Sequence, residues 1–265
     1  MPWAKLEDDL DMYYQMDDFT DPWKTPETIV LHHGMGKNTR MWYGWVPTLA
    51  RHYRVVRLDA RGFGQSSVPP SGYKWSFDNF ARDLRLLLDH LSLDGVHLVG
   101  ETLGGTIAMQ FASEYPERVR SLTICSSPFR FTDPIYGEHA QEIERDGMMS
   151  FARQGMSRRL DASQVDPAFV EWYANEMGKT SSRVAAEVLQ AHAGNDLSDK
   201  LRQIKAPTLI LTAEKFFLYS PKDIQEMQQL IPQAKLVVFP GVSGFIQYAR
   251  PEQCAQALLD FLGRL

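Results

Sequence analysis

The fold of this chain is constrained most by an alternation between short apolar runs and segments of helical periodicity. The runs are rich in β-branched residues and are apolar at nearly every position, which is typical of strands covered on both faces of a sheet. They lie at residues 28–34, 53–59, 96–100, 121–125, 208–213 and 235–240. Strands that alternate with helices predict an α/β fold, in which a mostly parallel sheet is flanked by helices.

One of the intervening segments has a clear helical pattern. Its apolar residues recur at intervals of three or four, so they fall on one stripe of a helix, and Ser76 precedes them as a candidate N-cap. The residues of the stripe are Phe77, Phe80, Leu84, Leu87, Leu88 and Leu91. We therefore expect a helix that begins after Ser76 and packs this stripe against the sheet.

The alternation stops between residues 129 and 204. This span contains no convincing strand, has helical periodicity and is rich in methionine. We predict an α/β core formed by residues 1–128 and 205–265, with residues 129–204 inserted as a helical cap over the ends of the strands. The alternative, several peripheral helices without a lid role, stays open at this point.

Charge and composition narrow the classes of partner. The 265 residues carry a formal net charge of −5, which gives no electrostatic basis for binding nucleic acid or an anionic membrane. No run of 18 apolar residues is present, so no membrane-spanning helix is expected. We expect a small-molecule substrate or ligand as the partner, and the oligomeric state is left open.

The N-terminus and the cysteines indicate the compartment. The stretch MPWAKLEDDLDMYY has acidic residues where a signal peptide needs an apolar core, so we expect a cytoplasmic protein. Cys125 and Cys254 are the only cysteines and lie far apart in the sequence, which favours two reduced, buried thiols. The spacing predicts no metal site, and nothing in the sequence calls for a cofactor.

The stretch VGETLGGT, residues 99–106, joins a predicted strand to a predicted helix. Gly100 and Gly104 would let the backbone make a tight turn at the carboxyl end of the strand. That turn would aim the side chain of Thr102 into a cleft, below the positive end of the following helix. GMGKNT, residues 34–39, also follows a strand, but it lacks the first glycine of a phosphate-binding loop and has Asn38 after the lysine, so nucleotide binding is a poor interpretation.

Over nearly its whole length the chain resembles the α/β-hydrolase superfamily. The motifs that carry the resemblance are VGETLGGT, LHHGMGKNTRMWYGWVPTLARHYRVVRLDARGFGQSS, PERVRSLTICSSP, APTLILTAEK and PEQCAQALLDFL. Within the superfamily the chain is most similar to the small capped esterases, enol-lactonases and C–C hydrolases. The resemblance implies an α/β-hydrolase fold with an inserted helical cap.

The resemblance also implies where the catalytic groups belong. Backbone N–H groups of Met35 and Leu103 would form an oxyanion hole, and Thr102 would stand at the nucleophile position, where the family has serine. The family's acid would fall at Phe216 and its histidine at Gly244. All three triad positions therefore depart from the family pattern, and no histidine follows His192.

Other residues are weighed as substitutes and as substrate contacts. His33, beside the oxyanion loop, would donate to a substrate oxygen or orient the loop, and the side chain of Glu101 is expected to point away from the cleft. His192 would lie over the cleft or on a helix surface. The expected substrate-binding residues are Trp42, Ser126, Trp172, Phe216 and Phe245.

Three functions remain open at this stage. The first is a cofactor-free enzyme that polarises a carbonyl or enolate with the Met35 and Leu103 amides, as a lyase, decarboxylase, isomerase or cyclase, or by atypical hydrolysis. The second is a ligand-binding pseudoenzyme, and the third is an esterase or lactonase whose acid and base have moved. We favour the first, because the elbow and the oxyanion loop are intact in the sequence. The apolar side chains expected at the vacated positions favour a small, uncharged or aromatic carbonyl compound as the substrate.

Overall fold

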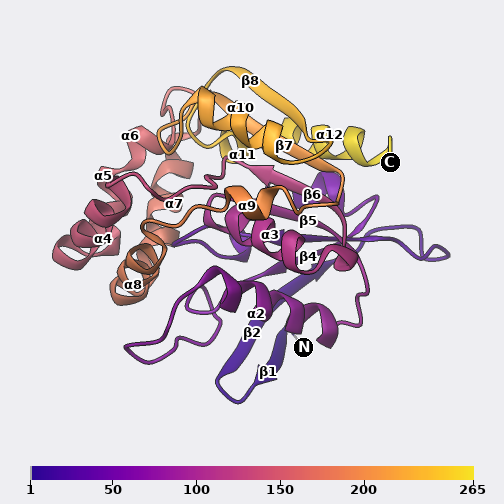
Figure 1. Ribbon diagram of the computed structural model, residues 1–265, viewed down its shortest axis with the longest axis horizontal. Coiled ribbons are helices and arrows are strands. Elements are labelled where there is room, and N and C mark those ends of the chain that lie inside the picture. Colours follow the sequence, from indigo (N-terminus) through magenta and orange to yellow (C-terminus); the bar gives the residue numbers. More distant parts are fainter. Residues whose placement is uncertain (1) are drawn as a thin grey trace.

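The computed structural model describes residues 2–265, which are built around one sheet (Figure 1). The sheet has eight strands in the order β1-β2-β4-β3-β5-β6-β7-β8. They are β1 Trp3–Glu7, β2 Leu10–Asp17, β3 Thr28–His32, β4 Arg54–Leu58, β5 Val96–Glu101, β6 Val119–Cys125, β7 Thr208–Lys215 and β8 Lys235–Ser243. Strands β3 to β8 pair in parallel, whereas β1 and β2 are antiparallel to their neighbours. The prediction of a mostly parallel sheet flanked by helices is confirmed.

The N-terminal hairpin of β1 and β2 was not predicted from the sequence. The acidic residues of this stretch led us to examine it only as a possible signal peptide. In the structure, Leu10 and Met12 alternate inward from β2 while Asp11 points outward, and β2 pairs with β4 from Tyr14 to Asp17. Alternation over so few residues is a weak signal for a strand. The position of β2 in the sheet follows from its pairing with β4.

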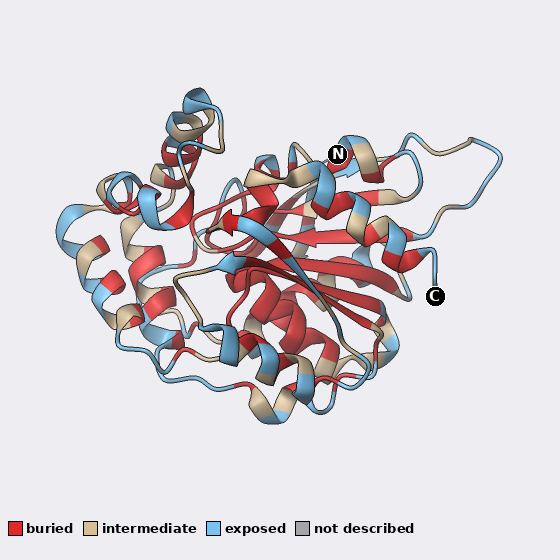
Figure 2. Ribbon diagram, turned by 90° about the horizontal axis from the view of Figure 1, so that it is seen from above, coloured by how far each residue is buried: buried red, intermediate tan, exposed pale blue. Residues whose placement is uncertain are grey.

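Helices cover both faces of the sheet, and the strand residues alternate between two apolar clusters. Val30, Leu98 and Ile124 face the side covered by α2 (Phe77–His90) and α3 (Leu103–Glu114). Ile29 and Leu31 face the side covered by α1 (Val46–Leu49) and α12 (Pro251–Leu262). Figure 2 shows the buried strands between these two layers. The remaining short elements of the core are η1 Thr39–Trp42, η2 Pro116–Arg118, α10 Pro221–Leu230 and α11 Ile246–Ala249.

Helix α2 begins as expected. The hydroxyl of Ser76 accepts a hydrogen bond from the backbone N–H of Asn79, which satisfies one of the free donors of the first turn. The stripe predicted for this helix is buried from Phe77 to Leu88, and Leu91 at its end is half-buried.

Residues 129–204 are helical, and none of their residues belongs to the described strands of the sheet. They form α4 Ile135–Asp146, α5 Met148–Gln154, α6 Met156–Arg159, α7 Pro167–Gly178, α8 Ser182–His192 and α9 Ser198–Leu201. Helices α4 to α8 lie together beyond one end of the sheet (Figure 1). The division into a core and a cap domain remains a prediction. Across the described part of the chain, no helix combines the length and the apolarity needed to cross a membrane.

Candidate active site

The turn after β5 holds Thr102 in a strained backbone conformation. Its φ of 47° and ψ of −122° lie outside the regions that β-branched residues normally adopt. The backbone N–H of Thr102 donates to the carbonyl of Cys125 at 3.1 Å, which ties the turn to β6. Thr102 is the N-cap residue of α3, but its side chain makes no capping hydrogen bond. The hydroxyl instead lies against the Cα atom of Gly34 in the facing loop.

The two backbone amides proposed for the oxyanion hole belong to residues that line one pocket with Thr102. Met35 lies in the loop after β3, and Leu103 is the first residue of α3. Neither backbone N–H donates to a protein acceptor within residues 2–265. A helix leaves its first N–H groups without partners and adds a positive field there, so the amide of Leu103 is a donor suited to developing negative charge.

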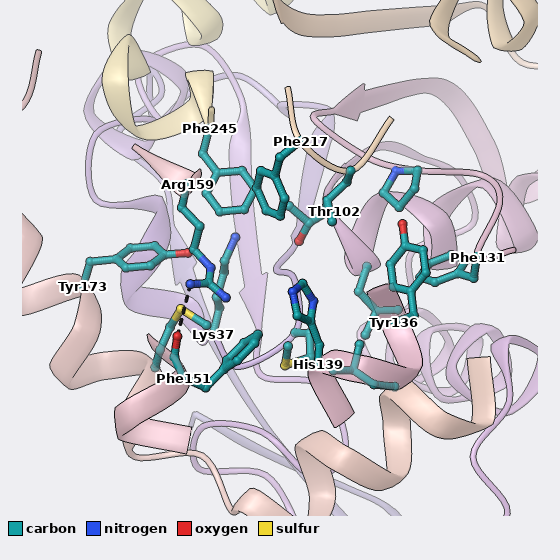
Figure 3. Close-up of a pocket in the computed structure, with 16 residues that line it drawn as sticks. Lys37, Thr102, Phe131, Tyr136, His139, Phe151, Arg159, Tyr173, Phe217 and Phe245 are labelled. Carbon is teal, nitrogen blue, oxygen red and sulfur yellow. Dashed lines mark hydrogen bonds between the residues drawn. The ribbon is translucent and has the colours of Figure 1, made fainter. Parts of the chain in front are cut away.

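The pocket lies between the carboxyl ends of the strands and the helical insertion, and Figure 3 shows its lining. The space around it, counted together with the open solvent at its mouth, is about 570 Å³. The lining residues are Met35, Lys37, Thr102, Leu103, Pro128, Phe131, Tyr136, His139, Phe151, Arg159, Tyr173, Met177, Leu189, Phe217, Leu218 and Phe245. Most of these are apolar, but two of them are buried cations.

Lys37 is the first of these cations, and it pairs with Glu101 behind the elbow. Its Nζ lies 2.9 Å from Oε2 of Glu101, and both side chains are almost fully buried. The carboxylate also accepts hydrogen bonds from Nε2 of Gln247 and from the hydroxyl of Tyr248, each at 2.6 Å. Nζ lies 4.3 Å from the ring centre of Phe245. Burial lowers the pKa of Lys37, although the charge of Glu101 opposes this shift.

The Glu101 carboxylate therefore joins three segments of the site. As expected, its side chain points away from the pocket, towards the loop after β3 and α11. A buried carboxylate with this many donors is satisfied, and so the network fixes the relative positions of the loop and the elbow.

Arg159 is the second buried cation, and it enters the pocket from the end of α6. Its side chain donates only two long hydrogen bonds, of 3.3 and 3.4 Å, to the carbonyls of Phe151 and Ala152. Burial lowers the pKa of this guanidinium below its usual value. Figure 3 shows the side chains of Arg159 and His139 at the pocket with Thr102, and Lys37 close to Arg159.

His33 and His192 are held by contacts within the fold, whereas His139 faces the pocket. In His33, Nδ1 lies 2.7 Å from the carbonyl oxygen of Gly34 and Nε2 accepts from the N–H of Ala60, so both ring nitrogens are occupied. This geometry corresponds to the loop-orienting role and leaves no ring nitrogen for a substrate. The alternatives weighed for His192 are both wrong, because it is buried with its ring centre 4.0 Å from that of Phe77. His139 lines the pocket, and its Nε2 has no partner.

The positions assigned to the acid and the histidine contain no ionisable side chain. Phe216 follows β7 and packs on Phe245, with ring centres 5.4 Å apart. Gly244 has a φ of 83°, and a Cβ atom there would overlap the carbonyl oxygen of Arg159. Backbone from the helical insertion therefore occupies the space next to Gly244 that a side chain would need.

Several predicted substrate contacts lie outside the pocket lining, which corrects those assignments. Trp42 is 1% exposed and packs on Trp45 in the cluster below the sheet. Trp172 lines a separate surface hollow beside Arg40 and Tyr43, because α7 turns it outward. Ser126 is buried and does not belong to the lining.

Phe216 is likewise placed behind the pocket, where it lines two neighbouring hollows. Among the predicted substrate contacts only Phe245 belongs to the lining. Within residues 2–265, no group of three or more His, Cys, Asp or Glu side chains is arranged to hold a metal ion.

Comparison with known proteins agrees with the fold of the chain. A family model described as the alpha/beta hydrolase fold matches residues 27–251. The chain belongs to the α/β-hydrolase family. A curated α/β-hydrolase relative, the 2-hydroxy-6-oxo-2,4-heptadienoate hydrolase of Pseudomonas putida, is 28% identical over 250 residues, which cover 88% of each chain.

Two further likenesses cover most of the chain. A pimeloyl-[acyl-carrier protein] methyl ester esterase of Aeromonas hydrophila is 29% identical over 255 residues, which cover 89% of this chain and 95% of that one. The solved structure of an enol-lactonase from Burkholderia xenovorans LB400 superposes with a TM-score of 0.91 at 23% identity, covering 99% of this chain and 100% of that one. At that identity the structural likeness shows the α/β-hydrolase fold alone.

The two buried cations and the histidine of the pocket were not predicted from the sequence as site residues. Lys37 was considered only as part of a phosphate-binding loop, and neither Arg159 nor His139 has a local signal that sets it apart in a helical segment. Only the packing of the insertion against the elbow brings them to the pocket. Their presence also corrects the expectation of a lining suited to uncharged compounds.

Proposed function

We propose that this chain is a cofactor-free enzyme that binds a small carbonyl compound and stabilises negative charge on its oxygen with the backbone N–H groups of Met35 and Leu103. The reaction is of the lyase, decarboxylase, isomerase or cyclase type, and it proceeds without a Ser-His-Asp triad. The substrate is a small molecule, and the protein acts in the cytoplasm.

The observation that carries this proposal is the strained elbow itself. Holding a β-branched residue at a φ of 47° costs on the order of 1–3 kcal/mol, which the surrounding contacts must offset. A fold that had lost its chemistry would relax such a turn, because most substitutions that remove strain increase stability. Within residues 2–265, the turn leaves the N–H of Leu103 free at the start of α3, and Met35 of the same pocket also has a free N–H, so two donors are available to an oxyanion.

The side chains around Thr102 support a role other than that of nucleophile. A hydroxyl near its ordinary pKa attacks a carbonyl poorly unless a base removes its proton. Phe216 and Gly244 supply no base, and both ring nitrogens of His33 are occupied. Thr102 then serves as a shape element or as a hydrogen-bond donor to the substrate.

Relatives with hydrolytic names support a carbonyl substrate, since enol-lactonases, esterases and C–C hydrolases all act at a carbonyl carbon. In the proposed reaction the substrate oxygen still becomes negatively charged, but Thr102 does not attack the substrate to form a covalent intermediate. In such a site the amides contribute more in the transition state than in the ground state, which is the condition for catalysis.

A relocated base is the second candidate, and His139 favours it. Burial lowers the pKa of His139 to about 4, so the ring is neutral at pH 7 and its free Nε2 can accept a proton from water. A base with so low a pKa is weak at neutral pH, which places this hydrolytic function second.

The experiment that tests the first function compares an enolate-like ligand with its neutral ketone by calorimetry. Preorganised donors strengthen their hydrogen bonds as charge develops, so the charged analogue should bind more tightly. Equal affinity for the two ligands would favour a ligand-binding protein. Loss of turnover of any ester or lactone in His139→Gln, with unchanged binding, would favour the second candidate.

A further inference from the structure

Arg159 differs from the other buried cations in having no counter-ion among residues 2–265. Lys37 pairs with Glu101 at 2.9 Å, and Arg61 pairs with Asp83 at 2.8 Å. Arg159 is 5% exposed, yet it takes part in none of the ion pairs formed within residues 2–265. Its guanidinium instead makes two long hydrogen bonds to backbone carbonyls and contacts the ring of Phe151, whose centre lies 4.5 Å from Cζ.

An uncompensated guanidinium gives the pocket a net positive charge. The charge of Lys37 is cancelled by Glu101, so Arg159 contributes the excess. A buried charge without a partner is unfavourable, and an anion of the right size would offset that penalty when it binds. The planar guanidinium carries N–H donors in a fork that matches a carboxylate.

Unpartnered polar atoms around the same pocket are a second, independent sign of a polar ligand. The hydroxyls of Tyr136 and Tyr173 and Nε2 of His139 are buried and have no hydrogen-bond partner in the described part of the chain. All three residues line the pocket with Arg159. Buried polar atoms in folded proteins are nearly always satisfied, so their gathering at one pocket points to hydrogen bonds supplied by what binds there.

We propose that Arg159 is an anion subsite, and that the pocket takes a carbonyl compound that also carries a carboxylate. The carboxylate pairs with the guanidinium of Arg159, and the hydroxyls of Tyr136 and Tyr173 hydrogen-bond to the ligand. The carbonyl oxygen then lies at the amides of Met35 and Leu103; this part rests on the proposed function. The two polar ends fix the orientation of a short molecule across the pocket (Figure 3).

The test uses four ligands that vary the two groups separately. 4-Oxopentanoate has both a carbonyl and a carboxylate, 4-oxopentanamide replaces the charge, pentanoate lacks the ketone, and pentanamide lacks both. Binding of each is measured by calorimetry at pH 7 to the full chain. We expect 4-oxopentanoate to bind at least about ten-fold more tightly than 4-oxopentanamide.

Variants then assign the charge preference to one side chain. Arg159→Gln should reduce the preference for the acid over the amide to within about two-fold, and Arg159→Lys should retain part of it. Arg158→Gln removes the same charge from an exposed neighbour on α6 and should leave the preference unchanged. Thermal unfolding of each variant confirms that it is folded.

The outcomes separate the subsite from the proposed function. A preference for the acid that persists in Arg159→Gln, or that is absent from the parent protein, would overturn the subsite, as would failure of all four ligands to bind. If pentanoate binds as tightly as 4-oxopentanoate while the dependence on Arg159 holds, the subsite stands and the carbonyl function fails. If the ketone improves binding and Arg159 has no effect, the function stands and the subsite fails.

Discussion

The backbone N–H of Phe245 donates a 2.8 Å hydrogen bond to the carbonyl of Arg159. This bond joins the turn after β8, where the α/β-hydrolase family places its histidine, to the end of helix α6. Leu160 also forms an isolated bridge with Gly244. The end of α6 thus packs against the turn after β8, and the side chain of Arg159 lines the pocket beside that contact.

We predict that a side chain at Gly244 destabilises the protein by more than the cost of placing a non-glycine residue at a positive φ. Gly244→Ala places Cβ on the carbonyl oxygen of Arg159, whereas Gly241, with a φ of 68°, has open space around the same position. Gly241→Ala should cost about 1–2 kcal/mol of unfolding free energy, and Gly244→Ala about 1–3 kcal/mol more, from the overlap. Urea unfolding of the two variants measures the difference, and equal values would contradict the packed turn.

Serine-hydrolase chemistry should be negligible at Thr102. We expect no adduct on Thr102 after incubation with a fluorophosphonate probe, as judged by mass spectrometry, because Phe216 and Gly244 supply no base and both ring nitrogens of His33 are occupied. Thr102→Ser should not create esterase activity, and Thr102→Ala should change turnover only modestly. A stoichiometric adduct at this residue would revive the ordinary esterase.

Removing one amide donor should abolish turnover. Met35→Pro deletes a backbone N–H, and loss of one oxyanion donor elsewhere lowers kcat by about 10²–10³-fold. Met35→Leu keeps the amide and a similar volume, so it should retain activity and serves as the matched control. Circular dichroism shows whether the proline variant is folded, and a folded proline variant with parental activity would remove the oxyanion role.

The buried pair of Lys37 and Glu101 predicts a strong energetic coupling. Glu101→Gln leaves the Lys37 ammonium without a counter-charge, which should destabilise the protein by about 3–5 kcal/mol. In the double variant Glu101→Gln, Lys37→Met the uncompensated charge is gone, so much of that stability should return. Urea denaturation of the single and double variants measures the coupling. Additive losses would show that the two residues act independently.

Buried histidines, among them His32 and His33, predict a loss of stability in mild acid. Burial lowers the pKa of His32 to about 4 and that of His33 to about 3, from 6.5 in the unfolded chain. Below pH 6.5 the unfolded chain binds protons that the folded protein does not, so the free energy of unfolding falls as the pH drops towards 4. Each such histidine contributes a slope of about 1.4 kcal/mol per pH unit.

Two variants test how much of this pH dependence of the unfolding free energy comes from His33. In His33→Gln the amide oxygen can still accept from Ala60 but does not titrate, so the slope between pH 6 and pH 4.5 should decrease. His52→Gln changes an exposed histidine and should leave the slope as it was. Urea unfolding at several pH values decides between them, and identical slopes in all three proteins would contradict the prediction.

The sequence by itself determined the elements that depend on local pattern. The parallel strands appear as apolar runs because strands covered on both faces have no polar side. The turn between β5 and α3 could be predicted because a tight turn there needs Gly100 and Gly104. The resemblance then located Thr102, Met35, Leu103 and Phe245 at one pocket. The edge hairpin was missed because its alternation is short and its partner, β4, is distant in sequence.

Only the tertiary structure decided which side chains meet at the pocket. Trp172 and Phe216 are aromatic residues in plausible segments, yet the rotation of α7 and the packing after β7 direct them elsewhere. Lys37 and Arg159 lie 122 residues apart in the sequence. Their charges differ in compensation, because Lys37 pairs with Glu101 whereas Arg159 pairs with no carboxylate among residues 2–265. Charge compensation depends on distances between segments remote in the chain, and a linear pattern does not contain those distances.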